Sequence, residues 1–153
     1  MRGIMSNVNI RIKKIHGDAM VPTQGSANAA GFDLYAYLDQ TDRIVIQPHT
    51  TVMVGTGVAV AIPNDYWGGI FARSGLATKQ GLRPANCTGV IDPDYRGELI
   101  VALHNDFNTA REVKHGDRIG QLVIIPLPDV SYDIVDDLDD TVRGDGGFGH
   151  SGV

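Results

Sequence analysis

The chain has 153 residues, of which 42% are hydrophobic, and it carries a formal net charge of -5 at pH 7. A chain of this length buries about two thirds of the surface that it exposes when unfolded, which suffices for one domain with a single core. The negative charge argues against a nucleic-acid polymer as partner, because such binding rests on a basic face that releases counterions from the phosphates.

Short apolar runs, rich in β-branched residues and separated by glycine, proline, asparagine and aspartate, predict a chain made mostly of β-strands. In chain order, these runs lie at residues 8–15, 43–63, 67–75, 88–106 and 117–127. Only "RSGLATKQG", at residues 73–81, is expected to form a short helix. Many short strands with regular turns predict an all-β domain of two layers, such as a sandwich, a barrel or a jelly roll.

The single cysteine, Cys87, excludes a disulfide framework within the chain, and the five histidines fall at no zinc-ligand spacing. The N-terminal "MRGIMSNVNIRIKKI" lacks the apolar core of a signal peptide, and no apolar stretch is long enough to span a bilayer. These features predict a reduced, intracellular protein of the cytoplasm without a membrane partner.

After residue 128 the chain becomes an acidic stretch, expected to be a solvated linker, and then the glycine-rich tail "VRGDGGFGHSGV". The tail contains Gly144-x-Gly146-x-x-Gly149, but a dinucleotide-binding fingerprint needs a strand before it and a helix after it. Ordering the eleven residues from Arg143 costs on the order of 10–20 kcal/mol, so the free tail is expected to be disordered. Arg143 and Phe148 offer a charge and a flat ring to a ligand, which predicts a ligand-gated lid; the alternative is a frayed terminus.

The segment "TGVIDPDYRGEL" has the sequence of a β-hairpin tip. Pro93 fits the second position of a turn that begins at Asp92, and Tyr95 and Gly97 lead back into a strand. Asp92 follows an apolar strand, where a carboxylate either caps the turn or acts as a general base toward a bound water. The spacing alone leaves these two roles about equally open.

The segment "FARSGLA" places Arg73, Ser74 and Gly75 just after an apolar strand. A guanidinium, a hydroxyl and a glycine that permits close backbone approach together suit a phosphate chain. A strand end with a capping serine explains the same three residues equally well.

Two further segments carry polar residues of interest. "AAGFDLYA" places Asp33 inside an apolar run, and a buried acid must be hydrogen-bonded or face a metal or ligand. In "HGDRIGQLVI", Asp117 and Arg118 are able to pair with each other, and Gln121 is unremarkable at the start of a strand.

Taken together and in this order, five segments resemble the five ordered motifs of the trimeric deoxyuridine triphosphate diphosphatases, or dUTPases. The segments are "AGFDLYA", "RSGLA", "GVIDPDYRG", "GDRIGQ" and "RGDGGFGHSG", and the similarity extends over nearly the whole chain. The resemblance implies a β jelly-roll subunit, a homotrimer with three active sites shared between subunits, and Mg2+-dependent hydrolysis of dUTP to dUMP and pyrophosphate.

The resemblance also implies roles for single residues. Asp92 matches the acid that activates the attacking water, Gln121 a residue that holds this water or the α-phosphate, and Asp33 the acid that binds Mg2+ through water. The positions that match the phosphate-binding segment are Arg73, Ser74 and Gly75. The positions that match the uracil and deoxyribose site are Asn86, Val90, Ile91, Ile100 and Tyr95.

In the tail, the resemblance assigns Arg143 to the γ-phosphate and Phe148 to stacking on uracil. Gly147 and Ser151 match positions that close over the phosphates. The tail then acts as a lid whose ordering energy comes from the substrate.

The expected division of the chain is a jelly-roll domain over residues 1–140 and a flexible lid over residues 141–153. Ala72 and Gly120 stand where the family commonly has proline and alanine, at positions that carry no chemistry. Two other functions stay open: a dCTP deaminase, which shares the fold but needs a catalytic glutamate beside the base, and a regulatory protein that senses dUTP by binding it.

Overall fold

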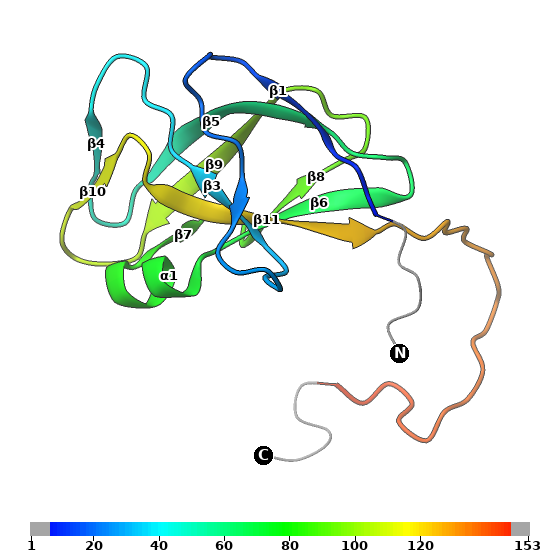
Figure 1. Cartoon of the computed structure of the whole chain (residues 1–153). Coiled ribbons are helices and arrows are strands. Elements are labelled where there is room, and N and C mark those ends of the chain that lie inside the picture. Colours follow the sequence, from blue (N-terminus) through cyan, green and yellow to red (C-terminus); the bar gives the residue numbers. More distant parts are fainter. Residues whose placement is uncertain (1–6, 148–153) are drawn as a thin grey trace.

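The computed structural model of the chain describes residues 7–147, in which strands dominate and one short helix interrupts them (Figure 1). A four-stranded antiparallel sheet has the order β1 (Arg11–Lys14), β5 (Thr51–Ala61), β9 (Glu98–Asn105), β7 (Leu82–Pro84). A five-stranded antiparallel sheet has the order β2 (Thr23–Gln24), β3 (Phe32–Tyr35), β11 (Arg118–Pro126), β6 (Tyr66–Phe71), β8 (Thr88–Ile91). A two-stranded ribbon pairs β10 (Arg111–Lys114) with β4 (Arg43–Ile46).

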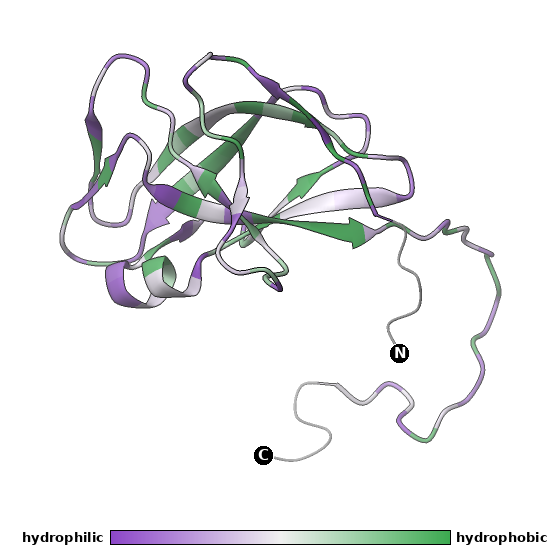
Figure 2. Cartoon of the chain, in the orientation of Figure 1, coloured by the Kyte–Doolittle hydropathy of each residue, from purple (hydrophilic) through white to green (hydrophobic). Residues whose placement is uncertain are grey.

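The core lies between the two larger sheets, because strands of both contribute to one cluster of buried side chains. Buried and outward positions alternate along β9, so that Leu99, Val101 and Leu103 face the core. Leu34 and Leu122 meet them from the five-stranded sheet. Colouring by hydropathy shows apolar residues concentrated on strands such as β5, β9 and β11 (Figure 2). The all-β domain of two layers predicted from the sequence is therefore confirmed.

The short helix α1 spans Ser74–Gln80 and follows β6 closely, as expected. No helix among residues 7–147 is long and apolar enough to cross a membrane. The helix ends at Gly81, which has a left-handed φ of 68° and whose N–H donates to the Ala77 carbonyl oxygen at 3.1 Å. A side chain at Gly81 would collide with the ring of Phe107, so both the backbone conformation and the packing require glycine. The far end of α1 is thus fixed, while its first turn faces outward.

The hairpin predicted around Asp92 is wrong in its pairing. The turn itself forms, since the Tyr95 N–H donates to the Asp92 carbonyl oxygen at 3.1 Å. The flanking strands belong to different sheets, because β8 pairs with β6 whereas β9 pairs with β5 and β7. β8 approaches β6 closely where Gly68 has no side chain; a Cβ there would lie 3.2 Å from the Cβ of Ile91. The chain therefore crosses from one layer to the other at this turn.

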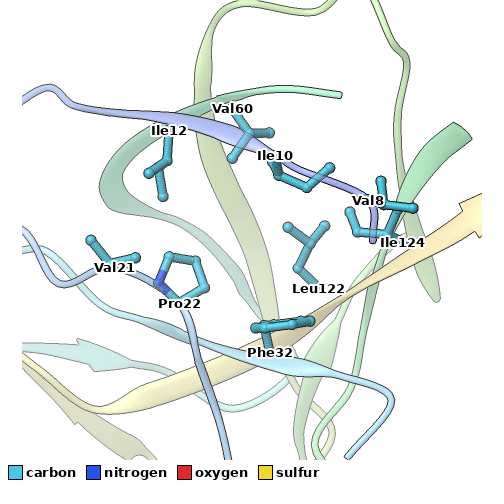
Figure 3. A pocket seen from close by; sticks show the side chains of 9 residues that line it. All are labelled: Val8, Ile10, Ile12, Val21, Pro22, Phe32, Val60, Leu122 and Ile124. Atoms are coloured by element: carbon cyan, nitrogen blue, oxygen red, sulfur yellow. The ribbon is translucent and has the colours of Figure 1, made fainter. Parts of the chain in front are cut away.

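β1 lies at the edge of its sheet and borders an apolar groove of about 250 Å³ (Figure 3). The side chains that line the groove are Val8, Ile10, Ile12, Val21, Pro22, Phe32, Val60, Leu122 and Ile124. After β11 the chain leaves the sheets as an arm over residues 127–147 (Figure 1). Apolar side chains of this arm are exposed, among them Tyr132 at 92% and Ile134 at 101%. The chain alone therefore leaves both an apolar groove and an apolar arm open to solvent.

Candidate active site

A polar pocket of about 210 Å³ collects residues of three of the quoted motifs. Asp33 comes from β3, Gln121 from β11, and Arg73, Ser74 and Gly75 from the junction between β6 and α1. Strand pairing explains why they meet, since Gln121 lies opposite Asp33 on one side and opposite the end of β6 on the other. The structure thus brings together three candidate phosphate ligands and two further candidate site residues.

The first turn of α1 is open toward this pocket. The residue at the N-cap position is Arg73, and no side chain caps the helix, so the interpretation of Ser74 as a capping serine is wrong. A Cβ at Gly75 would meet no protein atom within 4 Å, so the packing of the chain does not require glycine there. The missing side chain instead leaves room for a ligand to approach the backbone.

Asp33 lies between two arginines. Its Oδ1 accepts a hydrogen bond from Arg73 Nε at 2.7 Å, and its Oδ2 accepts one from Arg118 Nη1 at 3.2 Å. The side chains of Asp33 and Arg73 are only 13% and 26% exposed, so the charge-assisted bond between them is weakly screened by solvent. The acid in the apolar run is therefore hydrogen-bonded, as expected of a partly buried carboxylate. Because Arg73 bonds it through Nε, the two terminal nitrogens of Arg73 remain available for a ligand.

Gln121 is held in place by its amide nitrogen, which donates to the Ala72 carbonyl oxygen at 2.8 Å. Its amide oxygen lies over Gly31, where a Cβ would collide with it. The amide oxygen is thereby left as an acceptor at the wall of the pocket, which suits a residue that holds a water.

Replacing Gly31 with alanine should displace Gln121 and lower kcat of the expected hydrolysis by about tenfold to a hundredfold, the range that a misplacement of about 1 Å produces. The matched control is Gly17→Ala, because a Cβ at Gly17 meets nothing within 4 Å. Steady-state kinetics and the melting temperature of both variants separate lost positioning from lost folding. Full activity of a folded Gly31→Ala variant would show that the position of Gln121 is not needed.

The residues of the third motif lie apart from this pocket. Asp92 is exposed and follows β8, whose last residue, Ile91, pairs with Gly68. Asp92 therefore lies at the level of Trp67, six residues before Arg73 in the sequence. At about 3.3 Å per residue, an extended path from Trp67 to Arg73 is up to about 20 Å long, and Asp92 is not among the residues that line the pocket. A single chain does not bring Asp92 to the pocket that contains Arg73.

The residues expected to bind uracil and deoxyribose surround the same turn. Val90, Tyr95 and Ile100 are exposed, at 62%, 41% and 41% of their surface, and are open to a ligand or a neighbouring chain. The side chain of Ile91 packs in the core, so only its backbone is available for recognition.

An ion pair joins β7, just before the loop that carries Asn86, to the residue after β9. Arg83 donates from Nε and Nη2 to the two carboxylate oxygens of Asp106 at 2.7 and 3.0 Å. These hydrogen bonds hold the pKa of Asp106 below its ordinary value. The chain then turns at Cys87, which has a left-handed φ of 61°, and leaves Asn86 exposed beside Gly89.

The described part of the tail does not reach the pocket. Arg143 and Gly147 are exposed, and Arg143 Nε donates to the Gly146 carbonyl oxygen at 2.8 Å, which makes a local turn. Phe148 and Ser151 lie outside the described residues. The roles expected for these residues in closing the site stay predictions.

Comparison with known proteins identifies the family. The sequence profile of the dUTPase family matches residues 17–152. The chain belongs to the dUTPase family. It is 44% identical over 148 residues to a deoxyuridine 5'-triphosphate nucleotidohydrolase of Syntrophotalea carbinolica, with 97% of this chain and 99% of the relative covered. A nucleotidohydrolase of the same name from Wolbachia pipientis is 41% identical over 149 residues, with 95% of this chain and 96% of the relative covered.

Solved dUTPase structures share the fold. A mutant of the dUTPase of Staphylococcus bacteriophage 80alpha, with dUpNHpp, matches with a TM-score of 0.85 at 26% identity and covers 95% of this chain and 99% of its own. A mutant dUTPase from phage phi11 of S. aureus, described with a structural Mg(II) ion, matches with a TM-score of 0.76 at 23% identity and covers 86% of this chain and 99% of its own. The predicted dUTPase-like jelly roll is therefore confirmed.

The residues of this dUTPase pocket do not form a metal cage by themselves. Within the described chain, no three histidine, cysteine, aspartate or glutamate side chains come together as metal ligands. Both oxygens of Asp33 are bonded to arginines, which disfavours Asp33 as a direct ligand. Each carboxylate oxygen keeps a second lone pair, so Asp33 fits the weaker role of accepting a hydrogen bond from a metal-bound water. The donor set suits an Mg2+ ion carried mainly by substrate phosphates.

Sequence reasoning missed four of the residues that line this pocket, Gly25, Ala29, Gly31 and Arg118. The sequence permits Arg118 to pair with Asp117, but Asp117 instead accepts the Lys114 N–H at 2.7 Å and closes a turn. Arg118 bonds Asp33, far away in the sequence, and no local pattern signals this contact. Gly31 lies within the quoted "AGFDLYA", so the motif was the available signal for it.

Proposed function

We propose that this chain hydrolyses dUTP to dUMP and pyrophosphate, in active sites shared between the subunits of a homotrimer. The observation that carries the proposal is the pocket where Arg73, Ser74 and Gly75 meet Asp33 and Gln121, in a chain of the dUTPase family. A guanidinium, a hydroxyl and an open backbone suit a chain of phosphates, and the neighbouring amide oxygen suits a bound water.

The reaction that these residues support is an in-line attack of water on the α-phosphate. Asp92, supplied by a neighbouring subunit, orients this water and takes its proton. Gln121 accepts a hydrogen bond from the same water, and Arg73 stabilises the negative charge that develops on the phosphate oxygens. Asp33 would hold Mg2+ through a water, and the ion would supply positive charge at the phosphates.

Asn86 and the backbone of the turn after β8 read the base. Cytosine presents the opposite pattern of donors and acceptors to uracil, and a site built on such hydrogen bonds rejects the wrong base by roughly 10⁴–10⁵. A thymine methyl is worth only about 1–3 kcal/mol through pocket contact, so its exclusion needs a rigid wall that clashes with it. Tyr95, whose hydroxyl donates to the Glu98 carbonyl oxygen at 3.0 Å, packs on the deoxyribose and leaves no room for a 2′-hydroxyl.

The tail over residues 141–153 closes the site as a lid over the domain formed by residues 1–140. Arg143 binds the γ-phosphate, Phe148 stacks on uracil, and Gly147 and Ser151 cover the phosphates. This closure expels water and so strengthens each electrostatic contact with the triphosphate. The exposure of the described tail residues supports a segment that is free to close over a ligand.

Two arguments support a site shared between subunits of the homotrimer. Asp92 follows β8 and does not line the pocket that contains Arg73, so one chain does not supply both residues to one α-phosphate. Apolar surface is also available for contact between subunits: Met53 and Ile100 are exposed at 66% and 41% on the outer face of the four-stranded sheet. The groove beside β1 and the arm after β11 add to this surface.

Two inactive variants should restore each other's activity if the site is shared. Asp92→Asn and Arg73→Gln chains are each expected to be nearly inactive. When the two are unfolded together and refolded, a site that takes Asp92 from one chain and Arg73 from the other is intact. Equal mixing should restore about one quarter of the sites in a closed cyclic assembly, measured as pyrophosphate release.

Each variant refolded alone is the control for this mixing experiment. Size-exclusion chromatography with light scattering at micromolar concentration should give the mass of three chains for all samples. If the mixture stays inactive although mixed trimers form, both residues belong to one chain's site and the shared site is wrong.

The proposed activity is tested by incubating the chain with dUTP, dCTP, dTTP and UTP in the presence of Mg2+, with pyrophosphate and ammonia measured separately. Only dUTP should release pyrophosphate at a useful rate. Release of ammonia from dCTP would instead identify a deaminase. Tight binding of dUTP without release of pyrophosphate would identify a regulatory protein that senses the nucleotide.

A further inference from the structure

β11 contains an irregularity at the point where it enters the pocket. Gln121 lies opposite Asp33 of β3, but two residues further along β3 the partner on β11 is Arg118, where a regular ladder would have Ile119. Because successive side chains of a strand point to opposite faces, regular pairing would put Ile119 on the face of Gln121 and Asp33. The register shift between residues 118 and 120 changes this order.

The register shift changes the face of the sheet on which two side chains lie. Ile119 is only 1% exposed and packs in the core, whereas Arg118 lies on the pocket face and bonds Asp33. A bulge of this kind inserts one extra residue into a strand and is a common means of redirecting a side chain next to an active site. The bulge in β11 therefore delivers a guanidinium to a carboxylate that already has one arginine partner.

We propose that Arg118 is a positioning residue, which acts through Asp33 to orient the phosphate-binding guanidinium of Arg73. The proposal rests on the proposed function, because it assigns a role within the same phosphate pocket. The last torsion of an aspartate side chain is soft, so a carboxylate held by one oxygen is free to rotate. Arg73 holds Oδ1 through Nε, and Arg118 holds Oδ2.

With both oxygens held, the plane of the Asp33 carboxylate is fixed, and with it the direction from which Oδ1 accepts the Arg73 Nε–H. This direction restricts where the terminal nitrogens of Arg73 point, and a guanidinium binds phosphate oxygens well only in a matching orientation. The exposed fractions of the three side chains agree with Arg118 acting on Asp33 from outside. The side chain of Asp33 is 13% exposed, that of Arg73 26% and that of Arg118 50%. Arg118 thus supports the buried pair from its solvent side.

Arg118 also lines the pocket, so the competing role is a direct contact between its own guanidinium and a phosphate. The two roles differ in one measurable respect. A positioning residue loses its effect once Asp33 or Arg73 has been removed, whereas a direct phosphate ligand keeps its effect in either background. Double-mutant cycles measure this difference.

In the otherwise unchanged chain, Arg118→Gln should lower kcat/KM for dUTP by about tenfold to a hundredfold. Arg118→Lys should stay within about threefold of the unchanged chain, since a single N–H meets Asp33 and an ammonium also supplies one. The matched control is Arg11→Gln, an exposed arginine of β1 that lines neither of the two cavities containing Arg73 and Arg118, and it should leave kcat/KM unchanged. Equal melting temperatures of the two glutamine variants separate positioning from global stability.

The deciding measurement is the effect of Arg118→Gln when it is added to a chain that already carries Asp33→Asn or Arg73→Gln. We expect the added substitution to change kcat/KM, and the Kd of a non-hydrolysable dUTP analogue, by less than about threefold in both chains. Two backgrounds are used so that the test survives if one of them fails to fold. If Arg118→Gln lowers kcat/KM and raises Kd by tenfold or more in every one of these chains, the proposal is overturned and Arg118 is a direct phosphate ligand.

The failure of this proposal is distinguishable from the failure of the proposed function. An unchanged chain that releases no pyrophosphate from dUTP contradicts the proposed hydrolysis. The Kd measurements need no turnover, so the cycles still decide the role of Arg118 in that case. A folded Arg118→Gln variant with unchanged kcat/KM and unchanged Kd would overturn the positioning role directly.

Discussion

Replacing Asp92 with asparagine is expected to lower kcat for dUTP by about 10²–10⁴-fold, the usual contribution of a general base, while the nucleotide still binds. Asparagine keeps the shape of the side chain but does not take a proton from water. Single-turnover kinetics measure the chemical step, and calorimetry with a non-hydrolysable analogue measures the Kd. A large fall in kcat with a nearly unchanged Kd is the expected pattern, because the base acts on the transition state.

Within the described residues the side chain of Asp92 makes no capping contact, and its action as a general base remains our proposal. Within the described chain the carboxylate of Asp92 has no hydrogen-bond partner, and the turn is closed by backbone groups, from the Tyr95 N–H to the Asp92 carbonyl oxygen. The matched control is Asp94→Asn, an exposed carboxylate in the same turn, which should leave kcat within about twofold, as expected of a surface change away from the chemistry. If Asp92→Asn turns over as fast as the unchanged chain, the water is activated by another group.

The apolar runs predicted as strands contain the long strands β5 and β11 and also the four-residue strands β1, β4 and β8. The eleven residues of β5 and the nine of β11 carry runs of apolar and β-branched side chains that no turn residue ends early. The two residues of β2 and the four of β10 are too short for any period to be seen, and they exist because neighbouring strands supply their hydrogen bonds. The prediction that β8 pairs with β9 failed for a different reason, because distant residues such as Gly68 decide which strand β8 pairs with.

Some residues of the candidate site are recognisable from their sequence neighbours, whereas others are placed by strand pairing between distant parts of the chain. Arg73, Ser74 and Gly75 are adjacent in the sequence, so their types alone indicate a phosphate segment. Arg118 reaches Asp33 only because β11 pairs with β3 through a bulge, and the residue types around it do not reveal that register shift. We propose that two chains contribute to one site. The sequence motif around Asp92 is then recognisable, but the structure of a single chain does not contain the complete site.

A chain that ends at Asp140 is expected to fold and assemble normally but to lose at least about 10²-fold in kcat, a loss comparable to removing one strong charge-stabilising donor. The last strand ends at Pro126, and the described hydrogen bonds of residues 141–147 stay within the tail, so the sheets do not depend on them. Affinity for the analogue should fall much less than turnover, because lid closure acts on the transition state more than on the ground state. The measurements are kcat, Kd and the mass of the assembly.

The physical reason for this expectation is the entropy of the tail. Ordering the eleven residues from Arg143 costs on the order of 10–20 kcal/mol, and their glycines give little packing in return, so only the ligand can supply the compensating contacts. Cleavage by protease within the tail should therefore slow when the analogue and Mg2+ are added, as Arg143 gains the triphosphate and Phe148 gains the base. Phe148→Ala should reproduce part of the loss in kcat without changing the assembly. Equal cleavage with and without the analogue, together with full activity of the chain ending at Asp140, would make the tail a frayed terminus.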